Sequence, residues 1–175
     1  MDGLWQRLDT AARNLFPLGL ALTALLVGAM PLYLPGYGMV APNLTLMVVF
    51  YWAIYRPDLF PAAVAFAIGL VQDALMGTPM GLNALVLLAV YGVVTTQRRF
   101  FQGKSFAVIW SAFLFVAFAA GFLGWLVMVA FGAALIDPMP GIFAALLTIV
   151  IYPLVTWLLA RIHHAVFPVG VHVSR

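Results

Sequence analysis

The sequence contains no cysteine and very little charge. Of its 175 residues, 7% are charged and 66% are hydrophobic, whereas about 25% of the residues in a soluble domain are charged. The lack of cysteine excludes disulfides, thiolate nucleophiles, iron–sulfur clusters and cysteine-based zinc sites. Since so few charged side chains cannot cover a water-soluble globule, lipid must surround most of the surface. We therefore predict an all-α integral membrane protein, folded as a single membrane domain over residues 1–175.

Signals for catalysis and for nucleic-acid binding are also missing. The sequence has no Ser/His/Asp set, no glycine-rich phosphate loop and no metal-ligand spacing. The net charge of +3 comes from residues in short hydrophilic breaks, not from a basic patch with interleaved aromatics. His163 and His164 are adjacent, so they cannot point at one metal from the same helical face. We expect no enzymatic activity, no cofactor, no metal and no nucleic-acid partner.

Six apolar runs are separated by breaks that contain proline, glycine or charge. The transmembrane helices predicted from these runs cover residues 14–34, 38–55, 59–76, 80–96, 105–131 and 142–160. Pro42 suits the first turn of the second helix, and Pro153 should kink the sixth. From Pro42 to Tyr55 the second run would reach only about 21 Å. Either residues 37–41 also enter the membrane, or protein shelters this helix from lipid.

The basic residues support this layout. If the N-terminus is cytoplasmic, all 8 Lys and Arg residues fall on the inner side. The outer loops, at 35–41, 77–79 and 132–141, contain none. The positive-inside rule therefore predicts that both termini are cytoplasmic. Residues 1–13 are amphipathic, so they form either an interfacial helix or a frayed terminus. The apolar run after them is longer than a signal-peptide core, so we expect it to be retained.

Asp73 is the one acidic residue inside an apolar run. Asp73 and Asn83 lie five residues on either side of Thr78, the centre of a tight outer turn, so they should share a depth. We predict a hydrogen bond between them, with Gln72 as a second candidate. Two interpretations of these polar residues are open. They either join the two helices by hydrogen bonds or, together with Tyr91, form an outward-facing site for a ligand or a proton. We favour the bonding interpretation because no basic residue is available at that depth.

Small residues four apart mark possible packing faces on two predicted helices. They are Ala24 and Gly28 in the first, and the pairs Ala117/Gly121 and Ala120/Gly124 in the fifth. Small residues at this spacing let helices approach closely. We favour internal packing over a groove for a partner's helix.

The segment from Pro42 to Tyr91 carries a resemblance to a known family. The residues concerned are Pro42-Asn43, Tyr51-Trp52 followed by Pro57, and then Gly69-Leu70, Asp73, Gly77, Pro79, Gly81 and Ala84-Leu85. With this pattern the chain resembles MreD, the rod shape-determining membrane protein of bacteria. Similarity of motifs covers about a third of the chain, and the outer helices match in character only.

The resemblance implies a role without implying a reaction. MreD works in the cell-wall elongation machinery of the inner membrane, where it associates with MreC, a single-span protein, and through it with MreB, RodA and a penicillin-binding transpeptidase. Its fold is similar to that of the substrate-binding membrane subunits of energy-coupling-factor transporters. The candidate partner-site or ligand-site residues are Asp73, Asn83, Gln72, Gly69, Gly77, Pro79, Gly81, Pro42, Asn43, Tyr51 and Trp52.

Two functions remain open from the sequence. The first is a non-enzymatic scaffold that binds MreC by contacts between transmembrane helices. Its docking surface would be an exposed face of the fifth helix or of the short second helix. The second is a membrane subunit of a transporter that binds a small molecule or lipid.

Overall fold

The computed structural model describes residues 2–30, 41–101, 103–130 and 137–166. All regular elements in these ranges are helices, as predicted, and no strand occurs among them. They are α1 (Asp2–Ala29), α3 (Leu44–Tyr55), α4 (Ala62–Met76), α5 (Leu82–Thr96), α6 (Arg98–Phe101), α7 (Phe106–Ala130) and α8 (Met139–Val166). Several bounds differ from the prediction. α1 is continuous from Asp2, and α8 extends beyond 142–160 at both ends. The helices α3, α4 and α5 begin at Leu44, Ala62 and Leu82, later than the predicted 38, 59 and 80, and α6 is an additional short helix.

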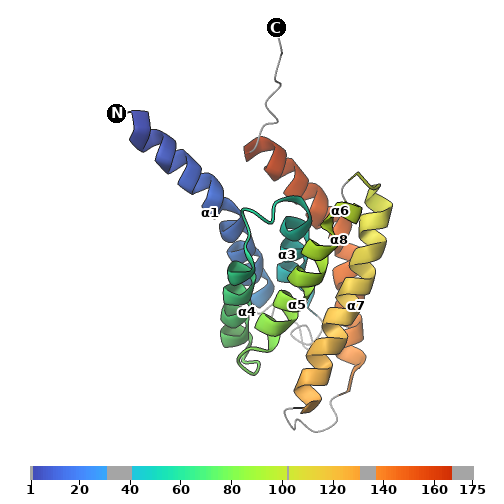
Figure 1. The fold of residues 1–175 in the computed structure, drawn as a ribbon. Helices are drawn as coiled ribbons and strands as arrows, with labels where there is room; N and C mark the ends of the chain where they lie inside the picture. Colours follow the sequence, from blue (N-terminus) through green and yellow to red (C-terminus); the bar gives the residue numbers. More distant parts are fainter. Residues whose placement is uncertain (1, 31–40, 102, 131–136, 167–175) are drawn as a thin grey trace.

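The short helix α3 forms the centre of the bundle (Figure 1). It packs against α1, α5 and α8, while α4 lies against α5 and α1, and α7 lies against α5 and α8. Every residue from Thr45 to Ile54 is at most 3% exposed. Protein therefore shelters this helix, which explains how a segment too short to span a bilayer is accommodated. The suggestion that the second helix offers a docking surface was wrong, because it has no exposed face over this stretch.

The first residue of α3 is set by Asn43 and not by Pro42. The Asn43 side chain accepts a hydrogen bond from the Leu46 N–H at 2.9 Å, as an N-cap residue does. Pro42 therefore precedes the cap, and its predicted place in the first turn was wrong. The Asn43 N–H also donates to Thr148 Oγ1 of α8 at 3.0 Å. This bond ties the start of α3 to the middle of α8.

The outer surface is apolar. Within α7 only four residues are buried, namely Ile109, Phe113, Ala117 and Ala120. Large side chains such as Phe115 (72% exposed) and Val150 (69% exposed) point away from the bundle. Two helices, Phe106–Ala130 and Met139–His163, are long and apolar enough to cross a membrane. A surface of this kind is stable in lipid and not in water, so this is a membrane protein.

The ends of the helices sort into two groups. Figure 1 shows the start of α1, the end of α8 and the short helix α6 towards one end of the bundle. The α4–α5 turn lies towards the opposite end. Arg98 and Arg99 belong to α6, and Arg161 belongs to the last turns of α8. This arrangement agrees with the expected gathering of basic residues on one side.

Candidate functional site

A buried carboxylate joins α4 to α5 at their shared turn. Asp73 is 1% exposed. Its Oδ1 accepts hydrogen bonds from Thr78 Oγ1 at 2.7 Å, from the Asn83 N–H at 3.0 Å and from Asn83 Nδ2 at 2.9 Å. Its Oδ2 accepts the Gly81 N–H at 2.9 Å. Asn83 Nδ2 also donates to Thr78 Oγ1 at 3.2 Å. The predicted hydrogen bond between Asp73 and Asn83 is therefore present, within a larger network.

Two glycines shape the turn that surrounds this carboxylate. Gly77 ends α4 in the left-handed conformation (φ +66°), which glycine adopts without steric cost. The N–H groups of Gly77 and Thr78 both donate to the Asp73 carbonyl. Gly81 precedes α5 with a φ of +98°. Between them, the Pro79 carbonyl accepts the Leu82 N–H at 3.1 Å and so closes the turn onto α5.

Asp73 acts as the N-cap that α5 lacks in its own sequence. Position 81 is a glycine, so it has no side chain to accept the first free N–H groups of the helix. The Asp73 carboxylate accepts two of them, from Gly81 and Asn83. A negative charge is also favoured at the N-terminus of a helix by the helix dipole. This explains why an acidic residue can sit in an apolar run without a cationic partner.

Close contact of the two backbones holds the hairpin together below the turn. A Cβ added to Gly69 would lie 2.3 Å from Ala84 Cα and 2.6 Å from Ala84 N. No larger residue fits there, so glycine at this position lets α4 and α5 approach without side chains between them. Gly69 therefore serves the same junction as Asp73, about one helical turn further from the α4–α5 turn.

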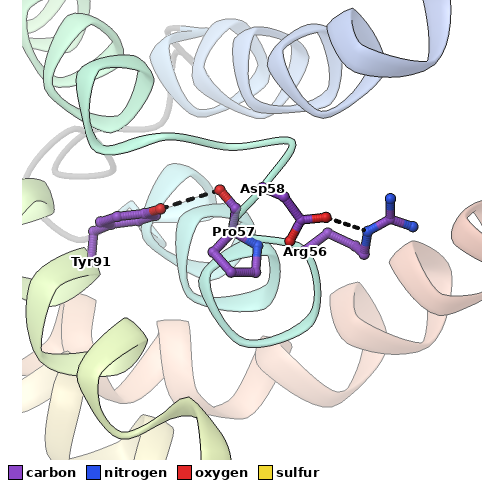
Figure 2. Close-up of polar contacts among 4 residues, drawn as sticks. All are labelled: Arg56, Pro57, Asp58 and Tyr91. Atoms are coloured by element: carbon purple, nitrogen blue, oxygen red, sulfur yellow. Dashed lines mark hydrogen bonds and ion pairs between the residues drawn. The ribbon is translucent and has the colours of Figure 1, made fainter. Parts of the chain in front are cut away.

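Gln72 and Tyr91 do not join this network. Gln72 is buried, but its Nε2 points to Met76 Sδ at 3.8 Å, and its Oε1 has no hydrogen-bond partner among the described residues. Tyr91 donates to the Pro57 carbonyl at 3.4 Å (Figure 2). Pro57 lies in the connection from α3 to α4, at the other end of the hairpin. The suggested pocket formed by Asp73, Gln72, Asn83 and Tyr91 therefore finds no support.

The same connection carries an ion pair. Arg56 Nε lies 3.2 Å from Asp58 Oδ2, and both side chains remain partly exposed (Figure 2). An exposed pair of this kind contributes little to stability.

Tyr51 and Trp52 lie at yet another place, near the C-terminal end of α3. The Tyr51 hydroxyl is 3.1 Å from His163 Nδ1 of α8, and the Trp52 ring centre is 5.4 Å from that of His163. These contacts tie the end of α3 to the last turns of α8. No local pattern in the sequence indicates this pairing, because Tyr51 and His163 are 112 positions apart.

The chemistry available to this arrangement is limited. Both Asp73 oxygens are occupied by donors of the chain itself, and the described residues contain no group of three or more potential metal ligands. The motif residues divide among three junctions: α4 with α5, the start of α3 with α8, and the end of α3 with α8. Each of them joins helices, so the candidate residues position the fold and do not surround a common ligand site.

Comparisons with known proteins support the resemblance found in the sequence. A family model described as rod shape-determining protein MreD matches residues 10–162. The search of curated proteins finds no match, and neither does the search of solved structures.

Proposed function

The chain belongs to the MreD family of rod shape-determining membrane proteins, and from this premise we propose that it is a non-enzymatic scaffold of the cell-wall elongation machinery. It holds an MreC-like single-span protein by helix contacts within the bacterial inner membrane. Through that partner it is linked to MreB, RodA and a penicillin-binding transpeptidase. The observation that carries this proposal is the outward face of α7, a long apolar helix with few buried residues.

The proposal includes six membrane spans with both termini cytoplasmic. Beside the two long helices, the structure has four shorter apolar helices, at Phe16–Ala29, Leu44–Tyr55, Ala62–Met76 and Leu82–Thr96. The placement of all 8 basic residues on one side of this layout supports it. A likeness to the substrate-binding subunits of energy-coupling-factor transporters is part of the same proposal and rests on the family resemblance.

A chain with so little polar surface acts through its helix faces. On α7, Phe115, Phe118 and Phe122 are exposed. Gly121 is exposed as well, and a Cβ added there would meet nothing within 4 Å. Glycine weakens a helix by about 1 kcal/mol relative to alanine, and internal packing does not require it at this position. Close approach of a partner's helix gives a reason for a small residue there.

Replacement of Gly121 by leucine tests this docking face. The variant should fold normally, because the added side chain points into open space. We expect recovery of the MreC-like partner from detergent-solubilised membranes to fall about tenfold, which corresponds to roughly 1.4 kcal/mol. The matched control is Gly92→Leu on α5, where the added Cβ would also meet nothing within 4 Å.

Three results separate the versions of the proposal. Loss of the partner with Gly121→Leu alone supports docking on α7. Equal recovery of the partner with Gly121→Leu and with Gly92→Leu would show that the partner does not dock on this face of α7. Recovery that persists after deletion of the partner's own transmembrane helix would contradict helix docking altogether.

A further inference from the structure

The helices on two sides of the bundle differ in length. α4 and α5 contain 15 residues each, and α7 contains 25. At about 1.5 Å per residue these helices are about 22 Å and about 37 Å long. The hydrocarbon core of a bilayer is about 30 Å thick. One edge of the molecule is thus too short for the bilayer and the other too long, and Figure 1 shows α7 extending beyond α4.

Tilting adapts only the long edge. A helix of about 37 Å fits a core of about 30 Å when it leans by roughly 35°. Tilting a short helix shortens its span further, so α4 and α5 cannot adapt in this way. The mismatch at the short edge must be met by the lipid, by immersion of polar groups, or by a covering chain.

Both ends of the short hairpin are polar. On the inner side, Arg56 and Asp58 precede α4, while Arg98 and Arg99 follow α5. On the outer side, the turn from Gly77 to Gly81 is irregular, and its Met80 is 71% exposed. Irregular backbone that faces lipid does not occur within the hydrocarbon core, because its polar groups would lose their hydrogen bonds. The polar ends therefore cannot sink inward by the missing distance.

The face between these ends is suited to lipid chains. The exposed large side chains of α4 are Phe66, Val71, Leu75 and Met76. The single charged residue of the hairpin, Asp73, is buried and hydrogen-bonded within it. The acyl chains of the lipid thus meet an apolar helix face. This face is shorter than the hydrocarbon core of the bilayer is thick.

We propose that the α4–α5 hairpin thins the bilayer beside it, so that the membrane is thinner at this edge of the molecule than in the undisturbed bilayer, by up to about 8 Å. The lipid it accommodates best is a phospholipid with short or easily compressed acyl chains. The α7 edge keeps the ordinary thickness. This inference rests on the six-span proposal above, but it does not depend on binding of MreC.

Spin labels on single cysteines measure the thickness at each edge. The natural chain has no cysteine, so each label site can be introduced without removing others. Ala63 and Met80 bracket the short edge, and Phe106 and Leu126 bracket the long one; all four are exposed. The purified full-length chain is reconstituted in dioleoyl phosphatidylcholine vesicles, and the depth of each label is read from its accessibility to oxygen and to a polar nickel complex.

We expect the Ala63 and Met80 labels both to lie within about 5 Å of the headgroups, on opposite sides of the membrane. A Met80 label about 8 Å inside the hydrocarbon, with the α7 labels on opposite sides, would overturn the thinning and leave the six-span proposal intact. A Met80 label shielded from both reagents would mean that another copy of the chain covers the turn, which also overturns it. If the two α7 labels lie on the same side, the six-span proposal itself fails.

Discussion

The α4–α5 hairpin and the α7–α8 pair solve the same packing problem in different ways. The hairpin joins short helices by a buried carboxylate network and by direct backbone contact at Gly69. The longer pair is joined by aromatic side chains, with the Phe113 and Tyr152 rings stacked 3.9 Å apart, and by a hydrogen bond from Trp110 Nε1 to the Ile149 carbonyl at 3.1 Å. Lipid is as apolar as these side chains, so burial alone does not drive helices together in a membrane. The short contact therefore relies on a cluster of hydrogen bonds around one carboxylate and on close backbone approach, whereas the long contact adds a hydrogen bond to extended van der Waals packing of aromatic rings.

The largest effect on this comparison should come from Gly69→Ala. The added methyl group would lie 2.3 Å from Ala84 Cα, so α4 and α5 must separate. We expect the free energy of unfolding in detergent to fall by about 3 kcal/mol. Gly92→Ala is the matched control within the hairpin, since its Cβ meets nothing within 4 Å. Equal unfolding midpoints for the two variants would contradict the close backbone contact.

The next largest effect should come from Asp73→Ala, which removes the acceptor for the Gly81 and Asn83 N–H groups. We expect a loss of about 2 kcal/mol in the free energy of unfolding and a lower amount of protein in membranes. Asp73→Asn should lose less, because one amide oxygen can still accept. Asp58→Ala, which breaks an exposed ion pair, is the control with little expected change. An abundant, stable but inactive Asp73→Ala protein would instead indicate a ligand site.

The α7–α8 pair should respond less to loss of one large side chain. Phe113 stacks on Tyr152 and meets the Phe50 ring edge-on at 5.1 Å. Because a lipid-exposed phenylalanine is not penalised in the unfolded membrane state, Phe113→Ala should cost about 1.5 kcal/mol, the worth of two aromatic contacts. Phe115→Ala on the same helix is the control, since that ring is 72% exposed. A larger loss than for Asp73→Ala, measured by the same unfolding assay, would reverse the ranking of the two regions.

The sequence predicted the helices and the Asp73–Asn83 bond because both follow from local rules. Apolar runs mark membrane helices, and a tight turn forces residues at equal distances from it to the same depth. Gly77 was placed correctly as the end of a helix for the same reason. Features that depend on residues close together in the chain could therefore be predicted without a structure.

Contacts between segments that are distant in the chain could not be predicted in this way. The short length of α3 offered shelter by protein as one of two alternatives, but the helices that bury it, α1, α5 and α8, could not be named from its own residues. The bond from the Asn43 N–H to Thr148 spans 105 positions along the chain. Tyr91 was misplaced because its depth on α5 was not weighed against that of Asp73; it lies eight residues from Asn83, about 12 Å along the helix.

The smallest effect should come from Tyr51→Phe, at the junction of α3 with α8. The change removes one hydrogen bond, from a hydroxyl 3.1 Å from His163 Nδ1, and keeps the ring in place. Hydrogen bonds between membrane helices contribute about 0.6 kcal/mol on average, so we expect a loss of this size. Tyr55→Phe is the control, because Tyr55 is a neighbouring tyrosine that is 40% exposed.

A double-mutant cycle with His163→Ala isolates the pair, since it cancels the other contacts that His163 makes. A coupling of about 0.6 kcal/mol would show that this junction is held by the bond itself. A coupling near zero would show that ring packing around Trp52 holds α8 to α3, as it holds α8 to α7. In that case the buried carboxylate network would be the distinguishing feature of the short hairpin, and the contrast between the two regions would become sharper.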